Sequence, residues 1–97
     1  MKLDELRDQI NGIDEQMTSL FSQRMKLCAD IAKFKQENGI AVLDASREEE
    51  VLNKIAALCD EDTAPYAVEL YKSIFEISRS FQADIIAKER KDGSEEI

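Results

Sequence analysis

The chain has 97 residues, the length of a single domain, and contains neither histidine nor tryptophan. Its 21 acidic residues outnumber its 13 basic ones, and the net charge of −8 argues against a basic surface for nucleic acid or an anionic membrane. No apolar run approaches the roughly 18 residues of a membrane span, and no signal peptide opens the chain. We therefore expect a cytoplasmic protein with no membrane or nucleic-acid partner.

The first stretch, residues 3–38, places apolar residues at alternating spacings of three and four, as in a heptad seam. These positions are Leu3, Leu6, Ile10, Ile13, Met17, Leu20, Leu27, Ile31 and Phe34. The pattern predicts one long helix that stops at Asn38-Gly39, where glycine suits a left-handed position. Such a helix spans about 50 Å, whereas a compact chain of this size has a radius of gyration of about 13 Å. We expect a second copy to cover the seam, which makes the protein an obligate dimer.

The seam is interrupted once, because Arg24 stands where an apolar residue is expected. Lys35 falls within roughly 20° of the same helix face and about 16 Å further along the axis. Two long cationic side chains on one face can hold a small anion between them. The alternatives are that Arg24 lies at the edge of the seam and pairs with an acidic neighbour, and that Lys35 is a solvated lysine of the helix face. Cys28 and Cys59 are expected to be reduced core thiols, in neither a disulfide nor a metal site.

A second helix is predicted after the apolar connector 40–43, beginning at Asp44 or Ser46. Ser46 and Glu49 have the spacing of a capping box, in which each side chain bonds the other's backbone N–H. Arg47 does not suit the positive end of a helix dipole, which suggests that it has another task.

A third helix is predicted to start at Thr63 and Pro65. Its apolar stripe is interrupted by Ser78 and Gln82, which stand one turn apart; the alternative to a functional role is a pair of satisfied core polar groups. We expect residues 1–90 to form the domain and the polar residues 91–97 to form a disordered tail.

Six segments of the chain carry a resemblance to a known family. They are Leu6-Arg7-Asp8-Gln9-Ile10, Ile13-Asp14, Gln23-Arg24, Lys33-Phe34-Lys35, Val42-Leu43-Asp44-Ala45-Ser46-Arg47-Glu48 and Ser78-Arg79-Ser80-Phe81-Gln82. Their order and spacing resemble the all-helical chorismate mutases over Leu3 to about Ile86. The resemblance implies an all-α, intertwined homodimer of three-helix chains that converts chorismate to prephenate, in phenylalanine and tyrosine biosynthesis. The reaction is a pericyclic rearrangement that needs no cofactor, metal or proton transfer.

The resemblance also implies roles for residues that face the substrate's carboxylates and its ether oxygen. Arg7 and Arg24 would bind the two carboxylates, since a guanidinium grips a carboxylate through two hydrogen bonds. Lys35 would bridge a carboxylate and the ether oxygen, and Gln82, where some members have glutamate, would donate an N–H to that oxygen. Arg7 precedes Arg24 by 17 residues, about 25 Å of helix, so one small ligand can reach both only if the partner chain supplies Arg7.

The remaining implied contacts lie on the hydroxyl side of the substrate and around the carboxylates. Glu48 would accept a hydrogen bond from the ring hydroxyl, and Asp44 would support that side or the loop. Arg47 and Ser78 would support the carboxylates.

The sequence leaves three alternatives open. One is an enzyme with the same fold acting on a related acid, such as an isochorismate pyruvate-lyase; the presence of Asp44, Arg47 and Glu48 favours the mutase. The second is a helical interaction module without catalysis. The third is an accessory domain that regulates another enzyme of the same pathway.

Overall fold

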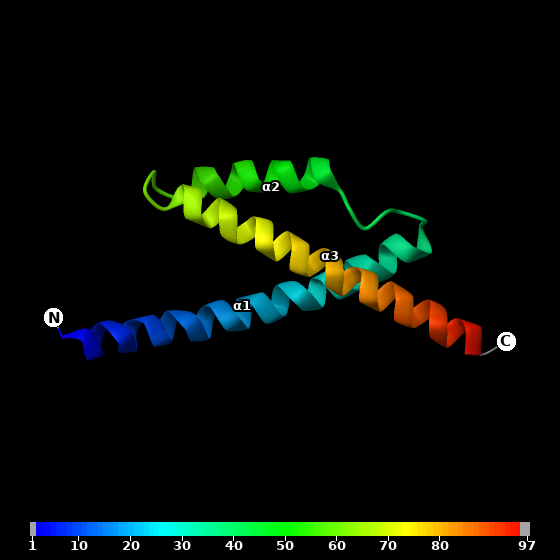
Figure 1. Ribbon diagram of the computed structural model, residues 1–97, viewed down its shortest axis with the longest axis horizontal. Helices are drawn as coiled ribbons and strands as arrows, with labels where there is room; N and C mark the ends of the chain where they lie inside the picture. Colours follow the sequence, from blue (N-terminus) through cyan, green and yellow to red (C-terminus); the bar gives the residue numbers. More distant parts are fainter. Residues whose placement is uncertain (1, 96–97) are drawn as a thin grey trace.

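The computed structural model describes the backbone of residues 2–95 and the side chains of residues 2–90. It contains α1 (Leu3–Glu37), α2 (Ala45–Leu58) and α3 (Ala64–Glu95), and no strand occurs within this described range. Figure 1 shows α2 running beside the first half of α3, while α1 crosses α3 near its middle. The prediction of an all-α chain with a long first, a short second and a long third helix is confirmed.

Helix α1 ends where the Asn38-Gly39 pair predicted. The backbone N–H of Asn38 donates to the Phe34 carbonyl at 3.1 Å, and its side-chain Nδ2 donates to the same oxygen at 2.8 Å. Gly39 has φ +64°, a left-handed conformation that glycine adopts without the steric cost of a Cβ. Ile40 N–H then donates back to the Lys35 carbonyl at 2.8 Å, which satisfies a further carbonyl of the last turn.

The start of α2 corrects one prediction. Asp44 is the N-cap: its Oδ1 accepts a hydrogen bond from the Arg47 backbone N–H at 3.0 Å. The alternative start at Ser46, with its capping box, is wrong, because Ser46 already lies inside the first turn. An aspartate at the N-cap places a negative charge at the positive end of the helix dipole.

Helix α3 starts as predicted, directly after Thr63 and with Pro65 in its first turn. Asp60 Oδ1 accepts the Thr63 backbone N–H at 2.8 Å. The Thr63 hydroxyl and then its backbone N–H lower the pKa of the Asp60 carboxyl from its ordinary value. The helical backbone continues to Glu95, inside the segment 91–97 for which a disordered tail is expected. Side chains from 91 onward, and residues 96–97 altogether, lie outside the described part.

A single chain of this fold is extended and has little interior. Its principal extents are 64 × 29 × 14 Å and its radius of gyration is 17.6 Å, against about 13 Å for a compact chain of this length. Helix α3 packs on both α1 and α2, which do not pack on each other within the described residues. Among the described residues, the buried apolar side chains are Cys28, Ala32 and Phe75.

The seam of α1 is open in the single chain. Ile10 is 55% exposed, Ile13 54% and Leu20 63%, although each is an apolar residue on the predicted helix stripe. Continuous apolar exposure of this kind marks an interaction surface. No helix in the described range is both long and apolar enough to cross a membrane.

Candidate functional site

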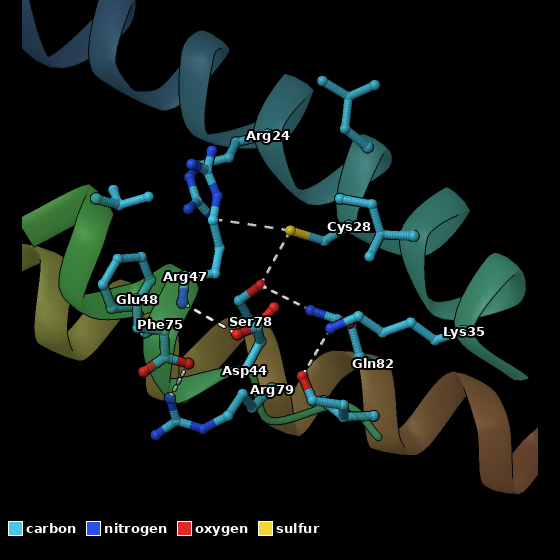
Figure 2. Close-up of a pocket in the computed structure, with 14 residues that line it drawn as sticks. Arg24, Cys28, Lys35, Asp44, Arg47, Glu48, Phe75, Ser78, Arg79 and Gln82 are labelled. Atoms are coloured by element: carbon cyan, nitrogen blue, oxygen red, sulfur yellow. Dashed lines mark hydrogen bonds and ion pairs between the residues drawn. The ribbon is translucent and has the colours of Figure 1, made fainter. Parts of the chain in front are cut away.

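The chain forms a pocket of about 380 Å³ where α1, the start of α2 and the middle of α3 meet (Figure 2). It contains every predicted site residue except Arg7. Arg24 and Lys35 come from α1, Asp44, Arg47 and Glu48 from the start of α2, and Ser78 and Gln82 from α3. Residues more than fifty positions apart in the sequence thus line one small cavity.

The two cations of α1 lie one at each end of this pocket wall. The Arg24 guanidinium is half-buried, lies 5.8 Å from the centre of the Phe75 ring, and donates through Nη1 to Cys28 Sγ at 3.7 Å. Lys35 Nζ donates to the Val42 backbone carbonyl at 2.7 Å. Within the described residues neither cation pairs with a carboxylate, so the alternative of an Arg24 paired with an acidic neighbour is wrong. Both charges remain available to an anion.

The α3 wall is polar and buried. Ser78 is 5% exposed and Gln82 6% exposed. Gln82 Nε2 donates to Ser78 Oγ at 3.3 Å, and Ser78 Oγ lies 2.9 Å from Cys28 Sγ. Cys28 is a free, buried thiol, as predicted, whereas the free thiol of Cys59 is half-buried at the end of α2. The dashed lines of Figure 2 follow this series of contacts from Arg24 to Gln82.

Glu48 has an ionic partner that the sequence patterns did not indicate. Its carboxylate pairs with the Arg79 guanidinium, which also lines the pocket, and the two side chains are 24% and 31% exposed. The Arg79 position follows Ser78 but lies about 100° away around the helix, off the stripe that periodicity identifies. Only the docking of α2 on α3 brings Glu48 to it.

Arg47 and Asp44 have contacts at the rim of the pocket. The exposed Arg47 side chain pairs with Glu50 at 3.1 Å, an interaction that solvent screens strongly. The Asp44 carboxylate caps α2 by accepting from the Arg47 backbone. The Asp44 side chain therefore has a structural task while it lines the cavity, whereas the Arg47 side chain has only a weak exposed ion pair.

The electrostatics of the pocket oppose those of the chain. Four cationic side chains (Arg24, Lys35, Arg47 and Arg79) and two acidic ones (Asp44 and Glu48) line it, a local excess of positive charge in a chain of net charge −8. Apolar residues fill the remaining wall; they are Leu27, Ile31, Val42, Val51 and Phe75. The sequence patterns placed this apolar set in core stripes or the connector. A positive cavity with apolar sides suits a small organic dianion.

Arg7 is the one predicted site residue that this pocket does not contain. It lies exposed in the first turns of α1, and Arg24 follows it by 17 positions on the same helix, about 25 Å away. One chain therefore does not bring Arg7 and Arg24 together.

The fold and pocket define a helical domain with a cationic cavity that has apolar sides. The family model for chorismate mutase type II matches residues 6–83. The chain belongs to this family. It is similar to a chorismate mutase of Methanocaldococcus jannaschii, with 29% identity over 83 residues, which are 84% of each chain.

A second relative is much longer than this chain. It is a bifunctional chorismate mutase/prephenate dehydratase of Buchnera aphidicola, 33% identical over 84 residues, which are 84% of this chain and 22% of that protein. No solved structure matches the chain significantly.

Proposed function

We propose that the pocket binds chorismate and converts it to prephenate, an isomerisation on the route to phenylalanine and tyrosine. The observation that carries this is the pair of cations without carboxylate partners, Arg24 and Lys35, which share one cavity with the buried amide of Gln82 in a chain of this family. Chorismate carries two carboxylates, and the net positive lining matches that charge.

The reaction breaks an ether C–O bond and forms a C–C bond within one molecule, without proton transfer. Negative charge develops on the ether oxygen, so donors aimed at that atom stabilise the transition state more than the substrate. Lys35 and Gln82 would supply these donors. The ammonium of Lys35 has three N–H groups and can keep its bond to Val42 while it donates to a ligand.

Arg24 would hold one carboxylate of the substrate. The Phe75 ring supports the face of its guanidinium, which leaves N–H groups at the edge for two parallel hydrogen bonds to a carboxylate. Arg47, at the rim, would contribute charge to the same end of the site. Glu48 would accept from the ring hydroxyl, and its pairing with Arg79 offsets the cost of an anion in a site for a dianion. Asp44 would support that side by fixing the start of α2.

The second carboxylate would be held by Arg7 of a partner chain. The exposed seam of α1 supports this proposal, because a homodimer with antiparallel first helices covers the apolar stripe. The same arrangement carries Arg7 of one chain toward Arg24 of the other. Each dimer would then contain two equivalent sites, both composite.

The activity is tested by following the loss of chorismate absorbance with purified protein and identifying the product. Prephenate is the expected product. Release of pyruvate would identify a lyase instead, and unchanged chorismate would contradict the proposal. Lys26→Ala should leave this activity unchanged, because Lys26 is an exposed cation of α1 that does not line the pocket.

The composite site is tested by mixing two inactive variants. Arg7→Ala and Arg24→Ala should each lose most activity as folded dimers. After subunit exchange, one site of each heterodimer regains both arginines, which should restore up to about a quarter of the wild-type rate. Verified heterodimers that remain inactive would contradict the shared site.

We also propose a cytoplasmic location. Both cysteines are free thiols, which suits a reducing compartment. Recovery of the native protein in the cytoplasmic fraction of its source is the expected result.

A further inference from the structure

The thiol of Cys28 lies at the back of the pocket, between the cation of one wall and the amide of the other. Its sulfur accepts a hydrogen bond from Arg24 Nη1 at 3.7 Å and lies 2.9 Å from Ser78 Oγ. It is the one atom that joins α1 to the polar wall of α3 by hydrogen bonds in the described structure. A cysteine in an apolar core position needs none of these contacts to fulfil a packing role.

The amide of Gln82 depends on this connection. Its Nε2 donates to Ser78 Oγ at 3.3 Å, whereas its Oε1 is buried and has no hydrogen-bond partner among the described residues. One hydrogen bond therefore sets the rotation of the amide about its last side-chain bond. That bond requires a fixed Ser78 hydroxyl, and the other polar contact of this hydroxyl is the Cys28 thiol.

We propose that Cys28 is a positioning residue for the rearrangement, which acts through Ser78 to hold the Gln82 amide with one N–H directed to the ether oxygen. The proposal rests on the proposed function for the identity of that oxygen. Either the thiol or the hydroxyl can donate the hydrogen that lies between them. The sulfur therefore fixes Ser78 in both arrangements. Ser78 then keeps a lone pair for Gln82, whose second N–H remains for the substrate.

The effect of Cys28 should fall on turnover more than on binding. Arg24, which would bind a carboxylate, has separate support from the Phe75 ring and would keep its place without the thiol. Gln82 has no such second support. Loss of the thiol should therefore reduce kcat and kcat/KM by similar factors and leave KM within about twofold.

The test compares Cys28→Ala with Cys28→Ser, two variants of nearly equal size that differ in one hydroxyl. Alanine should lower kcat by about threefold to tenfold, the effect of a single neutral hydrogen bond. Serine should recover most of this loss. Cys59→Ala, at the far end of α2, should match the wild type in both constants. Equal kcat for the alanine and serine variants, both folded, would overturn the proposal, because a packing defect affects them alike.

A double variant tests whether Cys28 acts through Gln82. If it does, Cys28→Ala should cause no further loss of kcat in a protein that already carries Gln82→Ala. A loss of the same factor in both backgrounds would overturn the proposal.

A spectroscopic measurement keeps this question separate from the proposed activity. The side-chain amide of Gln82 can be observed by 15N NMR in the free dimer and assigned through its absence in Gln82→Ala. Its resonance should move in Cys28→Ala and return toward the wild-type position in Cys28→Ser. This result supports the connection even if chorismate is not turned over, in which case only the proposed function fails. A resonance unchanged in Cys28→Ala would overturn the connection itself.

Discussion

At the residue scale, the pocket separates charges that are paired within the chain from charges that are not. Glu48 has Arg79, whereas Arg24 and Lys35 have an aromatic face, a sulfur and a backbone carbonyl. A half-buried cation without a counter-ion reduces the stability of the free protein. A bound dicarboxylate offsets this cost, so ligand binding should raise the melting temperature.

Gln82 makes the pH profile a test of the ether-oxygen contact. An amide does not titrate near neutrality, so wild-type turnover should be nearly flat from mildly acidic to mildly basic pH. Gln82→Glu should be poor at neutral pH, because an ionised carboxylate cannot donate, and should recover on acidification. Burial at this 6%-exposed position raises the pKa of the new carboxyl and brings recovery closer to neutrality, while nearby Lys35 opposes that shift.

The measurement is kcat against pH for both proteins, with helicity followed at each point. A Gln82→Glu variant as active as the wild type at neutral pH would remove Gln82 from this role. So would a variant that stays folded in acid but does not recover.

Arg79 should matter through Glu48. Arg79→Ala leaves that carboxylate beside a dianionic ligand without its partner, so KM should rise about threefold to tenfold, the equivalent of about 1 kcal/mol. Arg79→Lys should keep part of the effect, because an ammonium retains the charge but not the fork of donors. Lys72→Ala, which removes an exposed ion pair with Glu69 on the same helix, is the matched control and should change neither KM nor stability. An unchanged KM in Arg79→Ala would limit this ion pair to holding α2 on α3.

At the scale of the helices, sequence patterns predicted the features that depend on neighbouring residues, namely where a helix forms and where it ends. Heptad spacing predicted α1, and the Asn38-Gly39 pair predicted its end. The start of α2 remained ambiguous, since Asp44 and Ser46 both carry an acceptor suited to an N-cap. The sequence does not show that Lys35 would bind the Val42 carbonyl and so hold the connector that leads into α2.

The site was predictable to a different degree. Periodicity alone identified Arg24, Ser78 and Gln82, because each interrupts a pattern. It also identified Lys35, which falls on the same helix face as Arg24. The roles of Glu48 and Asp44 came from the family resemblance. Arg79 was missed because its partner is 31 positions away, a separation that no helical period encodes.

Gly12, inside α1, and Gly39, just beyond its end, form a matched pair for stability. Gly12 lies inside α1 with nothing near its missing Cβ, so Gly12→Ala should stabilise the protein by about 0.5–1 kcal/mol through helix propensity. Gly39 has the same open space but φ +64°, so Gly39→Ala should destabilise by roughly 1 kcal/mol. Denaturant unfolding at fixed protein concentration measures both. Stabilisation by both variants would contradict the assigned conformation at Gly39.

At the scale of the whole molecule, one chain does not enclose a core large enough for its length. The few buried side chains and the open seam predict that folding depends on association. Sedimentation at micromolar concentration should give twice the mass of one chain, and the melting temperature should rise with protein concentration. A compact, active monomer at any concentration would contradict the dimer.

The seam and the pocket share one uninterrupted helix of 35 residues, and this restricts how the gene can change in length. Inserting a single codon between Ile13 and Arg24 would turn everything beyond it by about 100°, so apolar positions before and after the insertion would no longer share a face. The connectors 38–44 and 59–63 have no such phase to keep. Insertions and deletions fixed during descent should therefore concentrate in these two loops, while α1 changes by substitution alone.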